Sequence, residues 1–262
     1  MPKASDQWWG SFNIPQEKWC FWEISLLKFY VFKAQNEWHF AWTREGDPLD
    51  TSLQSDFSGT ELPDLENTEQ SHYVFTHTRG GFNLGLALAD RSIVARPDVS
   101  VSIPPGHEVI LYVSSGIWLQ PNVDGLVLLE LPIYRPSDTW FGPNTRTGEL
   151  CYFSLTRARA ASTESLVYPH RAITPITIIN DGSELLKIER IRVPMQYLSL
   201  RLNKRGEFVT DSVIFRLGTD ADEARLEFTD EENKSTRFTQ IATPREEPSD
   251  GLVIQTLAWL FG

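Results

Sequence analysis

The chain has 262 residues, of which 41% are hydrophobic and 23% charged, so it can bury a core without disulfides or metals. Its formal net charge of −11 repels phosphate backbones, and the sequence shows no strong basic patch, so we expect no nucleic-acid partner. No apolar leader opens the chain, and no run reaches the ~20 apolar residues that cross a bilayer. We therefore expect a cytoplasmic protein that reaches a membrane only through a partner.

Period-two alternation of hydrophobic residues dominates the first half of the chain. Residues 20–32 are predicted to form one long strand or two joined by a bulge, and residues 38–44 return as a hairpin partner. The acidic segment 45–70 lacks periodicity and is predicted to be a loop. A proline-glycine turn within 99–120 predicts another hairpin. Further strands are predicted at 72–78, 82–89, 92–97 and 125–136.

The segment 137–148 gathers turn-forming residues around the aromatic pair Trp140 and Phe141. We interpret this segment as a joint between two domains, with a new strand beginning just after it. Arg157 and Arg159 follow that strand and are expected to hold the joint through carboxylates or backbone carbonyls, which a guanidinium group binds as a fork.

Beyond the joint, residues 172–194 carry Asn-Asp-Gly-Ser between two apolar runs, a pattern typical of a β-hairpin. Many short strands separated by turns are typical of β-sandwiches. We therefore predict an all-β fold of two tandem antiparallel β-sandwich domains with a short apolar tail. The predicted divisions are 1–136 for the N-terminal sandwich, 137–148 for the inter-domain joint, 149–245 for the C-terminal sandwich and 246–262 for the tail.

The last twelve residues, 251–262, are almost entirely apolar and are predicted to be helical. At ~1.5 Å per residue this helix is too short to cross a bilayer. It packs on its own domain, docks into a groove of a partner or inserts at a membrane interface, although a basic face is missing. The predicted partner-binding residues are Leu252, Ile254, Leu257, Trp259, Leu260 and Phe261 in the tail, and Trp140 and Phe141 in the joint.

Chemistry-bearing motifs are missing from the sequence. No nucleophile elbow, P-loop or dinucleotide fingerprint occurs, so we expect no catalytic residues. Cys20 and Cys151 lie in apolar strand-like runs, and Arg157 is ~20 Å along an extended chain from Cys151, so both thiols are expected to be buried and inert. Because the histidines lack metal-binding spacing, neither a metal nor a cofactor is expected. These histidines are His39, His72, His77, His107 and His170.

The nine tryptophans and two carboxylates leave one alternative open. Most of the tryptophans are expected in the core, because large aromatic rings supply much of a sandwich's burial energy. Exposed indoles would instead indicate sugar stacking. Glu23 and Glu130 lie within apolar strands, and a pair of inward carboxylates is the arrangement of a glycosidase. The alternative function is therefore a carbohydrate-binding or glycoside-active sandwich.

The segment from about 140 to 217 resembles a family of unknown function, the domain-of-unknown-function family 432. The similarity lies in Phe141-Gly142, then Gly148, then Tyr152 in an aromatic strand, followed by ITPITIIN and by strands ending near VIFRL. The N-terminal WWGSFNIP is also similar. The resemblance implies no defined activity or site residues. Genes of this family are associated with small mechanosensitive channels, so the resemblance implies a channel-accessory role.

Taken together, these patterns favour a non-enzymatic cytoplasmic binding or accessory protein. Its expected partner is a protein, with the cytoplasmic part of a small mechanosensitive channel as the specific candidate. A homo-oligomer with a structural role is the third alternative.

Overall fold

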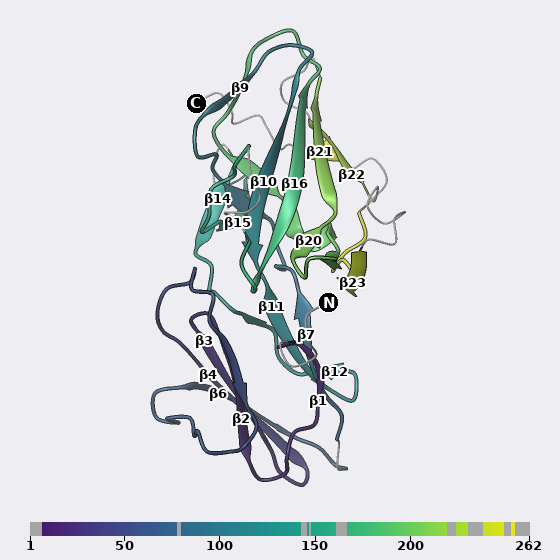
Figure 1. Ribbon diagram of the computed structural model, residues 1–262. Helices are drawn as coiled ribbons and strands as arrows, with labels where there is room; N and C mark the ends of the chain where they lie inside the picture. Colours follow the sequence, from purple (N-terminus) through teal and green to yellow (C-terminus); the bar gives the residue numbers. More distant parts are fainter. Residues whose placement is uncertain are drawn as a thin grey trace. The chain divides into compact units, whose positions relative to one another are not determined.

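The computed structural model describes residues 7–77, 80–142, 146, 148–160, 167–218, 224–229, 238–248 and 253–254 (Figure 1). Within these residues the protein is all-β, as predicted, and its helical content is a single 3-10 turn, η2 (Met195–Tyr197). None of the described segments is a helix with the length and apolarity that a membrane span requires.

The chain divides into two compact units, and each consists of more than one chain segment. The first unit contains residues Met1–Ala87, Ile117–Arg135 and Tyr168–His170. The second unit contains Leu88–Gly116, Pro136–Val167 and Arg171–Gly262. This division differs from the predicted one, because residues 88–116 were expected in the N-terminal domain but cluster with the C-terminal segments.

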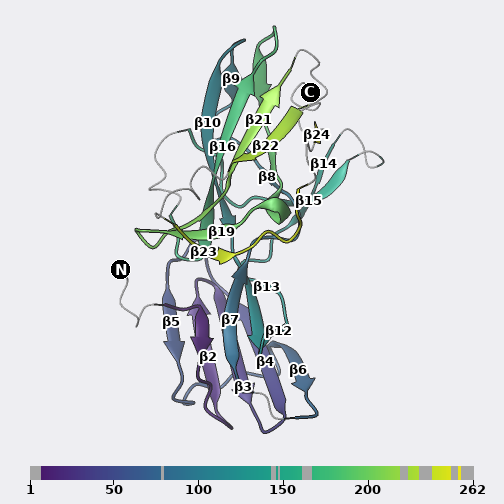
Figure 2. The same ribbon diagram turned by 90° about the vertical axis from the view of Figure 1, so that its right-hand side faces the viewer.

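The first unit contains two antiparallel sheets (Figure 2). One has the order β5-β2-β3-β4-β6, and its strands are β5 (Leu53–Asp56), β2 (Trp19–Ile24), β3 (Leu27–Lys33), β4 (Glu37–Arg44) and β6 (Glu69–Val74). The other has the order β1-β7-β11-β12, with β13 also on β11, and its strands are β1 (Gly10–Phe12), β7 (Phe82–Ala87), β11 (Trp118–Val123), β12 (Leu126–Val127) and β13 (Leu131–Pro132).

Aromatic side chains pack the two sheets of the first unit against each other. Phe82 of β7 lies 5.8 Å from Trp22, 5.6 Å from Trp38 and 6.4 Å from Phe40 between ring centroids, and all four side chains are buried. The predicted hairpin at 20–44 is confirmed, with one addition. Its first run is two strands, β2 and β3, joined by a tight turn in which Ser25 has a positive φ of 55°.

The second unit contains a large sheet built around one long strand, β16 (Arg171–Asn180). One edge of β16 pairs antiparallel with β10 (Glu108–Gly116), and the other edge pairs parallel with β20 (Phe208–Thr210) and β21 (Ser212–Leu217). The sheet is completed by β19 (Leu200–Asn203), β23 (Phe238–Ala242), β22 (Ala224–Thr229) and β24 (Val253–Ile254).

Two smaller sheets complete the second unit. A four-stranded sheet has the order β14-β15-β8-β18, from β14 (Asp138–Phe141), β15 (Glu149–Phe153), β8 (Ile93–Ala95) and β18 (Ile191–Val193). A two-stranded ladder pairs β9 (Val101–Ile103) with β17 (Leu186–Ile188). Arg192 of β18 forms an ion pair with Glu149 of β15, which joins the strands on either side of β8.

Three predictions about strand pairing are wrong. The hairpin expected at 99–120 does not form, because β9 pairs with β17 and β10 pairs with β16. The hairpin expected at 172–194 does not form either, since β17 and β18 pair with β9 and β8. The pairing is not antiparallel throughout, because β16 runs parallel to β20 and β21, and β15 runs parallel to β8.

The predicted helical tail lies mostly outside the described residues. Within it the structure describes 246–248 and 253–254. Val253 and Ile254 form the strand β24 on β22, so this dipeptide is extended instead of helical.

Phe82→Ala should destabilise the first unit by about 3–5 kcal/mol, because it removes the ring that three aromatic side chains of the facing sheet contact. Urea unfolding followed by tryptophan fluorescence measures this loss. The matched control is Val74→Ala, which truncates a side chain that is 67% exposed and should change the free energy of unfolding very little. Equal effects of both substitutions would show that Phe82 does not hold the core.

Candidate functional site

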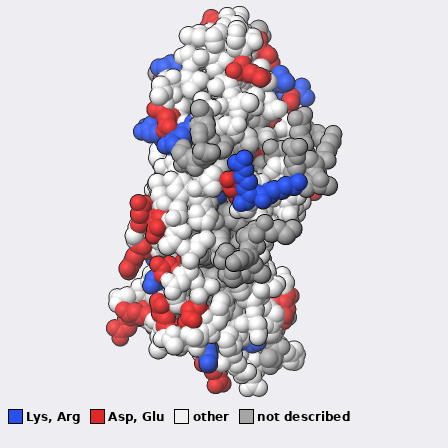
Figure 3. Space-filling view, viewed as in Figure 1, with Lys and Arg blue, Asp and Glu red and all other residues white. Residues whose placement is uncertain are grey.

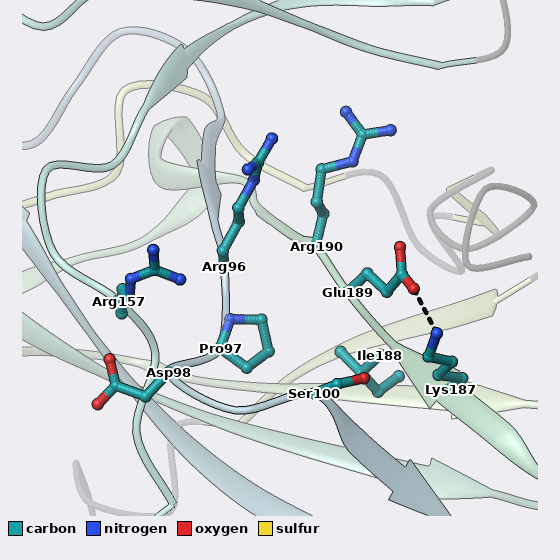
Figure 4. Close-up of a pocket in the computed structure, with 9 residues that line it drawn as sticks. All are labelled: Arg96, Pro97, Asp98, Ser100, Arg157, Lys187, Ile188, Glu189 and Arg190. Carbon is teal, nitrogen blue, oxygen red and sulfur yellow. Dashed lines mark ion pairs between the residues drawn. The ribbon is translucent and has the colours of Figure 1, made fainter. Parts of the chain in front are cut away.

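A cavity of about 570 Å³ opens on the surface of the second unit (Figure 4). Its lining is rich in charged side chains, with four cations against two carboxylates. The lining residues are Arg96, Pro97, Asp98, Ser100, Arg157, Lys187, Ile188, Glu189 and Arg190. We call this cavity the arginine pocket.

Strand β8 brings the three arginines of the pocket together. Antiparallel β18 pairs Ile191 with Ala95, so Arg190 and Arg96 lie one residue beyond the last pair of that ladder. On the other edge of β8, parallel β15 leads into a segment whose Ala158 bridges to Pro97. The Ala158 amide donates to the carbonyl of Arg96 at 2.8 Å, which places Arg157 beside it.

The carboxylates of the pocket are already engaged. Lys187 Nζ lies 2.6 Å from Glu189 Oε1, and this ion pair lowers the pKa of the Glu189 carboxyl below its ordinary value. Asp98 Oδ2 lies 2.8 Å from Nε of Arg159, which is outside the arginine pocket. Lys187 and Glu189 therefore neutralise each other, and Asp98 is neutralised by Arg159 from outside the pocket.

Arg96, Arg157 and Arg190 form no ion pair with a carboxylate among the described residues, although Arg190 and Arg96 also contribute to lowering the pKa of Glu189. In Figure 4 the guanidinium groups of Arg96 and Arg190 point the same way, with Arg157 on the other side of Arg96. Aromatic rings lie beneath two of them. Arg96 is 5.8 Å from the ring centroid of Phe153, and Arg190 is 5.7 Å from that of Phe141. These contacts restrain the guanidinium groups without neutralising them.

An apolar hollow of about 290 Å³ adjoins the arginine pocket and shares Pro97 and Asp98 with it. Its lining includes Val99, which is 77% exposed. The other lining residues are Val101, Leu111, Ala158, Arg159 and Ala160. The second unit therefore presents a cationic pocket and an apolar one next to each other.

The charge pattern of the first unit differs from that of this site. On the face shown in Figure 3, acidic side chains predominate over the region of β2, β3, β4 and β6. The sequence shows no strong basic patch, but the fold brings Arg96, Arg157 and Arg190 to one cavity. The sequence does not reveal this cluster because the three residues are far apart along the chain.

Arg157 and Arg159, predicted to hold an inter-domain joint, both lie in the second unit. Arg157 lines the arginine pocket, and Arg159 pairs with Asp98 beside it. Trp140 is half-buried. Phe141, predicted as a contact residue, is 4% exposed and packs with Val94 and Cys151, so its ring is not available to a partner.

The tail residues predicted to contact a partner are not placed by the structure. Leu252, Leu257, Trp259, Leu260 and Phe261 lie outside the described residues, and for Ile254 only the backbone pairing of β24 is described.

Glu23 and Glu130, the two carboxylates considered for a glycosidase, each contact a different residue. Glu23 pairs with Lys28 at 3.5 Å on the β2–β3 ladder. Glu130 accepts a hydrogen bond of 2.6 Å from Gln120 of β11, in the other sheet of the first unit. Of the eight described tryptophans, Trp8, Trp22, Trp38 and Trp42 are buried in the core and the other four are half-buried.

A family model described as "Protein of unknown function (DUF432)" matches residues 8–261. No curated protein and no solved structure matches the chain.

Both thiols should be unreactive in the folded protein. Burial raises the pKa of Cys20 to about 11 and that of Cys151 to about 12, so at pH 8 only roughly one Cys20 thiol in a thousand is ionised. Titration with Ellman's reagent at pH 8 should give almost no release until a denaturant is added, and then two thiols per chain. Rapid labelling of Cys151 in the native protein would show that it is an accessible nucleophile.

Proposed function

We propose that this chain, which belongs to the DUF432 family, is a non-enzymatic binding protein whose second unit captures an acidic segment of a protein partner. The observation that carries the proposal is the arginine pocket, where Arg96, Arg157 and Arg190 line one cavity and form no ion pair with a carboxylate of the described residues. In a chain with a net charge of −11, such a cluster concentrates positive potential at one place.

Guanidinium groups suit this role because each presents a planar fork of N–H donors that matches a carboxylate or phosphate. Arg96 and Arg157 are exposed and Arg190 is half-buried, so all three are within reach of a solute. Three like charges around one cavity repel each other, and a bound anion relieves that repulsion. Binding of an anionic group in the pocket is therefore electrostatically favourable.

The apolar hollow favours a protein segment as the source of the anion. An acidic residue can occupy the arginine pocket while a neighbouring apolar side chain of the same segment covers Val99 and Val101. A membrane surface is less suitable, because the net charge of −11 is repelled by anionic lipids.

Binding without chemistry is supported by the composition of the pocket. Its nine lining residues include neither histidine nor cysteine, and both carboxylates are held in ion pairs. Ser100 thus has no neighbouring base within the pocket that could activate it as a nucleophile. We propose that each unit is a sandwich domain and that the second unit is the scaffold of the pocket.

As the partner to test first, we propose the cytoplasmic part of a small mechanosensitive channel. This choice rests on the family resemblance alone, and the pocket adds one requirement. The contacting segment of that partner must combine an acidic residue with an adjacent apolar one.

Replacing each pocket arginine by glutamine should weaken the binding of a fluorescein-labelled peptide of alternating glutamate and leucine by roughly fivefold to tenfold, because each change removes one charged fork. Fluorescence anisotropy measures the dissociation constants. Arg205→Gln is the matched control, since Arg205 is an exposed arginine in the turn between β19 and β20, away from the pocket lining. Raising the salt concentration should weaken binding to the unchanged protein and have less effect on the variants.

Glu189→Gln should act in the opposite direction. It releases Lys187 from its ion pair and adds one unpaired cation to the pocket, so the same peptide should bind more tightly. Inorganic phosphate and anionic vesicles are the competing probes in this assay. If vesicles bind and the peptide does not, the partner is a membrane and not a protein segment. Equal peptide affinities of the pocket variants and of Arg205→Gln would contradict the proposal.

A further inference from the structure

A second cluster of chemistry-bearing side chains lies in the first unit, on the sheet β5-β2-β3-β4-β6. Glu37 and His39 are two residues apart on β4, so they share one face of the strand. In the antiparallel pairing of β4 with β6, His72 lies directly opposite His39. The ladder thereby joins three potential metal ligands from two strands. Spacing along the chain does not reveal this set, because His72 is 35 residues from Glu37.

The three potential ligand atoms lie close to one another. Glu37 Oε2 lies 3.2 Å from Nε2 of His39 and 3.1 Å from Nε2 of His72. All the ligand atoms lie within 4.8 Å of one another. For a tetrahedral zinc ion with bonds of ~2.0–2.1 Å, neighbouring ligand atoms are roughly 3.3 Å apart. The two distances to Glu37 therefore match the edges of such a site.

An aromatic row supports the cluster from the side. The rings of His39 and His72 are stacked with centroids 4.0 Å apart and an angle of 12° between their planes. Phe32 of β3 contacts the His39 ring edge-to-face at 5.5 Å, and Trp19 of β2 contacts Phe32 at 5.2 Å. This row limits the rotation of His39 and presents its Nε2 to Glu37, a pre-arrangement that lowers the cost of binding an ion.

We propose that Glu37, His39 and His72 bind one zinc ion, with a fourth position open to water or to a ligand. The three side chains are 43%, 33% and 47% exposed, respectively, so an ion can enter from solvent. Two imidazoles and one carboxylate form a His₂Glu set, which holds zinc in a site with one open position. Magnesium and calcium prefer oxygen ligands throughout, so neither should compete.

Zinc would also affect the fold locally. β6 is the edge strand of its sheet, and the ion would link its His72 to Glu37 and His39 of the neighbouring β4. Binding to the folded state alone raises its stability. The two cysteines do not offer an alternative site, because both thiols are buried and stay protonated near neutral pH.

Isothermal titration of the tag-free, full-length protein with zinc chloride, after treatment with EDTA, tests the proposal. The expected result is one zinc ion per chain and a higher melting temperature. His39→Gln and His72→Gln should each weaken binding by at least about 100-fold, because each removes a direct ligand. His107→Gln is the matched control, because His107 is an exposed histidine of the second unit that hydrogen-bonds the carbonyl of Pro105.

Melting curves in EDTA separate a lost ligand from a damaged fold. The histidine variants and the unchanged protein should then melt alike, and the difference between them should appear only when zinc is added. Cobalt substitution should give the visible absorption of a tetrahedral site in the unchanged protein but not in the two variants. A titration with no binding, or with equal binding to His39→Gln and His107→Gln, would overturn the proposal.

Discussion

The pairing of β8 with two neighbours that run in opposite directions is the constraint on which the arginine pocket depends. Parallel β15 lies on one edge and antiparallel β18 on the other, so the chain leaves β8 at Arg96 between the segments that carry Arg157 and Arg190. The ion pair between Arg192 and Glu149 joins the two outer strands. Removing either neighbour of β8 would separate the arginines, although none of them belongs to the strands themselves.

Local pattern predicted the strands well and their partners poorly. Apolar runs located the strands within 20–44, where side chains on both faces of β2, β3 and β4 are buried, and the partners there are adjacent in sequence. For 99–120 and 172–194 the turn residues were identified but the hairpins were wrong. The ladder between β10 and β16 joins residues such as Leu111 and Ile176, and nothing in the composition of either strand specifies a partner so distant in sequence.

The candidate sites show the same limit at the level of single residues. Burial of Cys151 followed from its place on an apolar strand face. The sequence predicts Arg157 as a residue that holds a joint, because its spatial neighbours Arg96 and Arg190 become visible only once β8 is paired. That Glu37 and His39 share a strand face can be predicted from the sequence, because they are two residues apart on one strand. That His72 lies opposite His39 can be known only from the register of β6 on β4.

The most direct measurement of the central claim is an NMR titration that follows the Nε–Hε signals of the arginines while a peptide of alternating glutamate and leucine is added. If the pocket captures an acidic segment, the signals of Arg96, Arg157 and Arg190 should shift together and saturate at one peptide per chain, with Arg205 unchanged. Shifts spread evenly over the exposed arginines, or no shift in these three, would contradict the account.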